Sequence, residues 1–103
     1  MNVKYQIIYW RDIPAQVKAK AGRERSGKPL SPRFNVAIDE AAMRAGLTES
    51  GDYLSQWRMS GWQESEGEPA EVAEALATEL EAAYPPERLR QLVDQQGLET
   101  PAE

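Results

Sequence analysis

The segment VKYQIIYWRDIPAQVKAKA, residues 3–21, decides the fold of this 103-residue chain. Five of the six residues 5–10 are aromatic or β-branched, a composition typical of a pleated, partly buried strand. Pro14 cannot donate a hydrogen bond to a sheet ladder, so it marks the corner at which this strand ends. Residues 17–21 alternate apolar side chains with Lys18 and Lys20, which predicts a second strand with cations on one face only.

Helical spacing of apolar residues appears only after this hairpin. Ser31 suits an N-cap, and Pro32 suits the first helical position, where a missing N–H costs nothing. Gly46 and Gly97 each follow an apolar stripe and are expected to supply left-handed C-terminal caps. The predicted helices cover residues 32–45, 69–84 and 86–96.

A third strand is predicted over residues 53–62, because polar and apolar side chains alternate through it. Residues 21–30, 48–52 and 63–68 are polar and predict loops or turns. The order β-β-α-β-α-α indicates an α+β fold, with helices packed on one face of a small three-stranded, mainly antiparallel sheet. The expected strands are residues 3–11, 15–23 and 53–62. The expected core comprises Ile7, Phe34, Ile38, Trp57, Val72, Leu76 and Leu80.

The length of the chain predicts a single domain, over residues 1–98, with a frayed tail at 99–103. Absence of cysteine excludes disulfides, thiolate catalysis and zinc–thiolate sites. Absence of histidine removes the commonest general base near neutral pH and the commonest transition-metal ligand. We therefore expect no catalytic residue, cofactor or metal site. Without an apolar membrane-spanning run or a signal-peptide pattern, we expect a cytoplasmic protein that does not bind membranes.

Charge is divided unevenly along the chain, whose net charge is −5. Residues 1–33 hold eight Lys and Arg against two carboxylates, whereas residues 34–103 hold four against 15. Such a dipolar chain can steer an anionic partner to its basic end. Alternatively, the basic hairpin lies beside acidic helices of the same chain, or its lysines guard a sheet edge against aggregation. The candidate partner-binding residues are Lys18, Lys20, Arg23, Arg25 and Lys28, together with Trp10 and Trp62, both expected to be partly exposed.

We expect a non-enzymatic accessory module that binds a protein or anionic partner through the basic hairpin. Two other functions remain open. The first is a small-molecule-binding or catalytic protein that uses a polar cluster of Arg11, Asp12, Asp39 and Arg58. The second is nucleic-acid binding through phosphate contacts and aromatic stacking. The acidic residues 34–103 repel such a polymer, so we expect this binding to be weak, sequence-independent and lost at physiological salt.

Four segments resemble a bacterial domain family labelled "virulence factor", whose domain also occurs in the larger conserved virulence factor C proteins. The resemblance implies a bacterial, cytoplasmic protein and brings no catalytic residue with it. It rests most strongly on WRDIPAQV, residues 10–17. The segments are YQIIYWRDIPAQVKA (5–19), RFNVAIDEAAMRAG (33–46), YLSQWRMSGW (53–62) and EVAEALATELEAAY (71–84).

Overall fold

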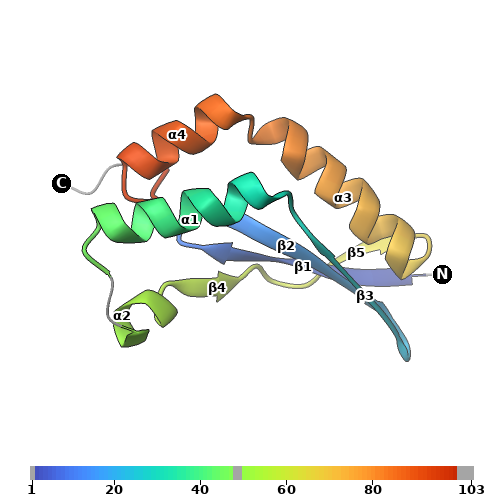
Figure 1. Cartoon of the computed structure of the whole chain (residues 1–103). Helices are drawn as coiled ribbons and strands as arrows, with labels where there is room; N and C mark the ends of the chain where they lie inside the picture. The colour runs from blue at the N-terminus through green and yellow to red at the C-terminus, as the bar shows by residue number, and fades with distance from the viewer. Residues whose placement is uncertain (1, 48–49, 100–103) are drawn as a thin grey trace.

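The computed structural model of the protein describes residues 2–47 and 50–99, and it has an α+β fold (Figure 1). Within these residues the chain forms one sheet of five strands, together with four helices. In chain order the elements are β1 (Asn2–Trp10), β2 (Ile13–Ala21), β3 (Glu24–Pro29), α1 (Pro32–Arg44), α2 (Ser50–Leu54), β4 (Trp57–Met59), β5 (Gln63–Glu66), α3 (Pro69–Ala83) and α4 (Pro86–Asp94).

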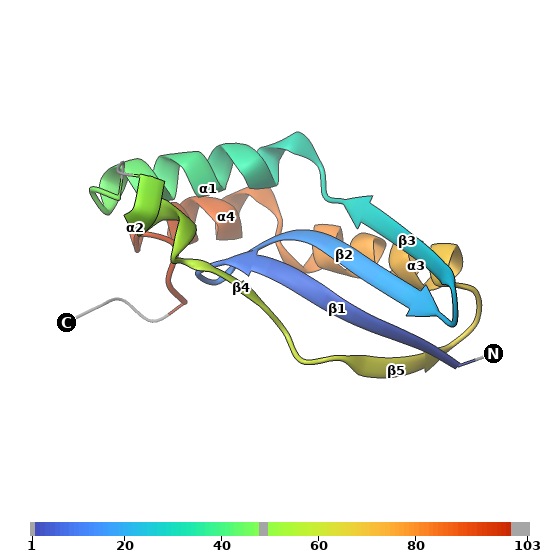
Figure 2. The ribbon, with the colours of Figure 1, turned by 90° about the horizontal axis from the view of Figure 1, so that it is seen from below.

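Strand pairing in the sheet is antiparallel, in the order β3-β2-β1-β4, and β5 also pairs with β1. β4 lies beside the end of β1, where Met59 is opposite Ile8, and β5 lies beside its start, where Ser65 is opposite Val3. Helices α1, α3 and α4 lie together over one face of the sheet (Figure 1). The view from below shows the other face, which these helices leave uncovered (Figure 2).

A single apolar core lies between the helices and the covered face of the sheet. Phe34, Ile38 and Val72 are buried in it, as expected. Burial of each large apolar side chain contributes about 1.5–3 kcal/mol relative to leaving it exposed. The other expected core residues are only partly buried and pack against its margin; they are Ile7, Trp57, Leu76 and Leu80.

Gly46 ends α1 in the way the sequence predicts, but at the end of α4 the first left-handed residue is Gln96, with φ +63°, and Gly97 follows it. Gly46 has φ +73°, and the following Leu47 N–H donates to the Ala42 carbonyl at 2.9 Å. Gly97 has φ +86°, and its own N–H donates to the Leu92 carbonyl at 2.6 Å. Both positions lie in the left-handed region that glycine adopts without steric cost.

The sheet has five strands and not the three that the sequence predicts. The predicted third strand, over residues 53–62, is also wrong in its extent. Residues 50–54 are helical, and β4 covers only residues 57–59. Packing of Tyr53 explains the difference, since its ring stacks on Trp10 at 5.8 Å and meets the Trp57 ring edge-on at 6.1 Å. This tertiary packing overrides the local alternation, from which strand propensity is inferred.

The sheet gains two strands where the sequence predicts loops. β3 and β5 consist largely of polar, exposed residues, and their backbones pair with β2 and β1. Neither strand buries a face, so neither carries the apolar alternation that reveals a strand.

The predicted tail begins in contact with the fold at Glu99, whose N–H donates to the Asp12 carboxylate. Residues 48–49 of the predicted turn and 100–103 of the predicted tail lie outside the described residues.

No helix among the described residues is both long enough and apolar enough to cross a membrane.

Candidate functional site

The uncovered face of the sheet carries a basic–aromatic patch, which we define as Lys18, Lys20, Arg25 and Trp62. Alternation along β2 places Val17 and Ala19 in the core and turns the two lysines to the opposite face. Arg25 lies directly opposite Lys20 in the β2–β3 pairing, so it joins the lysines on that face. Three cations from two strands therefore lie next to one another.

The patch surrounds a shallow hollow of about 240 Å³. Trp62 forms one wall and is 44% exposed, with its ring centroid 4.2 Å from the Lys20 ammonium. That cation–π contact holds the lysine against an apolar surface. Gly27, opposite Lys18, also lines the hollow and contributes no side chain to fill it. Among the residues that the structure describes, no carboxylate lines the hollow, which makes it suited to an anionic group.

The three remaining predicted binding residues lie outside this patch. Lys28 faces the helices, where its ammonium is 3.1 Å from the Glu74 carboxylate of α3. This ion pair agrees with the alternative in which the basic hairpin lies beside acidic helices of the same chain. Arg23 is exposed in the turn between β2 and β3. The expected exposure of Trp10 is wrong, because its side chain is fully buried and its indole N–H donates to the Tyr53 carbonyl at 3.0 Å.

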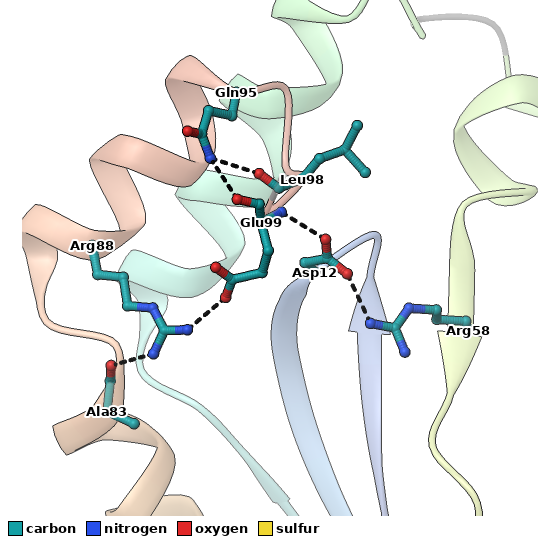
Figure 3. Close-up of polar contacts among 7 residues, drawn as sticks. All are labelled: Asp12, Arg58, Ala83, Arg88, Gln95, Leu98 and Glu99. Atoms are coloured by element: carbon teal, nitrogen blue, oxygen red, sulfur yellow. Dashed lines mark hydrogen bonds and ion pairs between the residues drawn. The ribbon is translucent and has the colours of Figure 1, made fainter. Parts of the chain in front are cut away.

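The corner between β1 and β2 brings together three of the four residues of the predicted polar cluster, Arg11, Asp12 and Arg58. One Asp12 oxygen accepts from the Arg58 guanidinium at 3.0 Å, and the other accepts from the Glu99 N–H at 2.7 Å (Figure 3). Arg58 also donates to the Arg11 carbonyl at 2.8 Å. Asp39 forms no hydrogen bond with these residues and is exposed on α1.

This corner holds the end of the described chain against the sheet. Arg88 joins the Glu99 side chain to the Ala83 carbonyl, while the Gln95 amide donates to the carbonyls of Leu98 and Glu99 (Figure 3). Both oxygens of the Asp12 carboxylate are thus bonded to donors of the same chain. Such an engaged carboxylate supports the fold and is a poor candidate for a general base, which needs access to a substrate proton.

Sequence reasoning missed a larger groove of about 530 Å³ between α1 and α4, lined by apolar side chains such as Leu89 and by Arg33, Arg44 and Arg90. Arg33 pairs with Glu81 at 2.8 Å, and Arg44 with Asp94 at 3.5 Å. Two of its three cations are therefore matched within the chain. Sequence reasoning also missed an apolar hollow lined by Ile8, Trp57, Arg58 and Met59. Its one available signal was Met59, an exposed apolar residue on a segment of alternating polarity.

Burial raises the pKa of Tyr84 above its ordinary 10.0; nearby Arg88 lowers it, while Tyr9, Glu99 and Asp12 raise it further. Burial, and then the charge of Asp39, raises the pKa of Tyr53. A phenol whose folded pKa exceeds its unfolded pKa stabilises the fold fully below pH 10, and this contribution is lost as the pH rises through the folded pKa.

We expect the urea midpoint to fall as the pH rises above 10. A Tyr53→Phe, Tyr84→Phe variant should lose less stability over the same pH range, because it lacks both phenols. Denaturation series at neutral and alkaline pH measure the difference. An equal alkaline loss in the double variant contradicts the assignment of the effect to these tyrosines.

No group of three or more Asp or Glu positioned to hold a metal ion is present in residues 2–47 and 50–99.

Comparison with known proteins identifies the family to which this fold belongs. No curated protein and no solved structure shows significant similarity to the chain. A family model described as "Virulence factor" matches residues 8–93, from the second half of β1 to α4. The match includes the β1–β2 corner and all four residues of the basic–aromatic patch. The chain therefore belongs to the Virulence factor family.

Proposed function

We propose that this protein is a non-enzymatic interaction module that binds an acidic segment of a protein partner through the basic–aromatic patch. One observation carries the proposal: three cations and a half-exposed tryptophan converge on a sheet face that the helices leave uncovered. Charge complementarity steers a partner and sets specificity, and a tryptophan at the centre of an interface supplies much of the binding energy.

The alternative of a catalytic or small-molecule site at the β1–β2 corner has less support. The carboxylate of Asp12 is already satisfied by Arg58 and the Glu99 backbone. The hollow at the patch, in contrast, is lined by cations for which the described residues supply no ion-pair partner. An unneutralised basic hollow is where an external carboxylate gains most, so the patch is the better candidate.

A fluorescein-labelled glutamate-rich peptide tests this proposal by anisotropy. We expect Lys20→Glu to weaken its binding by about tenfold or more, since the substitution places a like charge in the hollow. Arg90→Glu, on the exposed surface of α4, makes the same change in net charge and is the matched control. It should change the affinity by less than about twofold, because the intervening distance and salt screen its charge.

Two results contradict the proposal. Equal losses in the two variants indicate that only the net charge matters. Tighter binding of a labelled single-stranded oligonucleotide than of the peptide, at about 150 mM salt, makes nucleic acid the better-supported partner.

A further inference from the structure

β3 forms an edge of the sheet, and it is six residues long. Of the strands in the described part of the chain, only β2 pairs with it. In an antiparallel edge strand, alternate residues direct their N–H and C=O groups away from the single neighbour. Among residues 2–47 and 50–99, no backbone group of β3 forms a hydrogen bond with any element other than β2. The outer side of β3 is therefore available for pairing with another strand.

The hollow of the basic–aromatic patch is continuous with this edge, since Arg25, Ser26 and Gly27 of β3 line it. Of the atoms in the described residues, a Cβ atom placed on Gly27 would meet the Val17 carbonyl alone, at 4.0 Å, so this position is open. Adjacent strands lie about 4.8 Å apart. A long side chain from a strand beside β3 can therefore cross Gly27 and meet Lys18, which lies opposite it on β2.

We infer that the acidic partner segment binds as an extended strand added to β3, with one carboxylate side chain crossing Gly27 into the hollow. This inference rests on the proposed function. Arg25 and Gly27 are two residues apart, so they present the same face of the strand. The segment that fits carries carboxylates at positions i and i+2, one beside Arg25 and one reaching Lys18.

The charge of this edge selects such a strand. Lysine and arginine on an edge repel a second copy of the same strand and thereby protect a sheet from aggregation. An acidic strand meets no such repulsion and gains the backbone hydrogen bonds of strand addition as well. The same cations therefore repel a second copy of β3 and attract an acidic strand. Repulsion of the wrong partner in this way contributes to binding specificity.

Gly27→Val tests the route into the hollow without changing any charge. A β-branched side chain suits a strand, and no atom lies closer than 4.0 Å to its Cβ, so we expect the fold to be retained. The side chain blocks the crossing, and we expect the glutamate-rich peptide to bind about tenfold more weakly. Gly51→Val, in α2, is the control; its Cβ meets nothing within 4 Å, and we expect unchanged binding.

N-methylation of the peptide tests the strand pairing itself. Two peptides of one sequence, methylated on alternate backbone amides, remove opposite sets of donors. Only one set faces β3 in an added strand, so one peptide should lose binding and the other should keep it. Strand addition to β3 is contradicted if both methylated peptides bind the protein as tightly as the unmethylated peptide does, and if Gly27→Val also leaves the affinity unchanged. A loss on Lys20→Glu alone then retains the proposed function, whereas no loss on any change removes both proposals.

Discussion

Replacement of Trp10 by alanine is expected to lower the free energy of unfolding by about 4 kcal/mol, because it removes a large, fully buried aromatic side chain. The indole stacks on Tyr53 and donates to the Tyr53 carbonyl at 3.0 Å, so the change also leaves that carbonyl with only its longer hydrogen bond, from the Gln56 N–H at 3.3 Å, among the described residues. Trp10 additionally packs against the backbone at Gly97. Urea denaturation followed by far-UV circular dichroism measures the loss from the shift in midpoint.

Trp62→Ala is the matched control, since it removes the same side chain from a position that is 44% exposed. We expect it to cost less than about 1 kcal/mol in stability, as surface substitutions usually do. It should nevertheless weaken peptide binding, because the ring walls the hollow. A Trp62 variant as unstable as the Trp10 variant contradicts the assignment of one tryptophan to the core and the other to the patch.

The sequence does not distinguish these two tryptophans, since each lies at or next to the last residue of a predicted strand. The structure separates them through features that are not local. A register shift between Ile8 and Tyr9 alters the pattern before the strand ends, and α2 brings Tyr53 onto the Trp10 ring. The helices α1, α3 and α4 are better predicted because their start signal is local: each has a proline in its first turn.

The patch is predictable only where a strand is recognised. Residues 17–21 show a period of two, so Lys18 and Lys20 are correctly placed on one face. Lys28 belongs to a segment with no apolar alternation, and its turn toward the acidic α3 follows from the register of β3. Gly27 gives no signal of its own, because its importance arises from the lysine opposite it and from the edge on which it lies.

The second large effect is expected at Gly97, where alanine should destabilise the fold by about 3 kcal/mol. Its φ of +86° is unfavourable for any residue with a Cβ, and the added atom would lie 2.9 Å from Trp10 Cζ3. Gly46→Ala is the control, with a similar φ of +73° and nothing within 4 Å of its Cβ. It retains the backbone strain without the clash, so we expect a loss of about 1 kcal/mol.

A double substitution separates the two causes at Gly97. In a Trp10→Phe background the smaller ring leaves room for the new methyl group, so Gly97→Ala should cost only about 1 kcal/mol, as it does at Gly46. The difference of about 2 kcal/mol between backgrounds is the coupling between the two residues. Equal losses in both backgrounds, measured by urea denaturation, place the whole effect in the backbone. Because the Gly97 carbonyl accepts from the Asp12 N–H at 2.8 Å, a shift here also disturbs the corner that holds the chain end to the sheet.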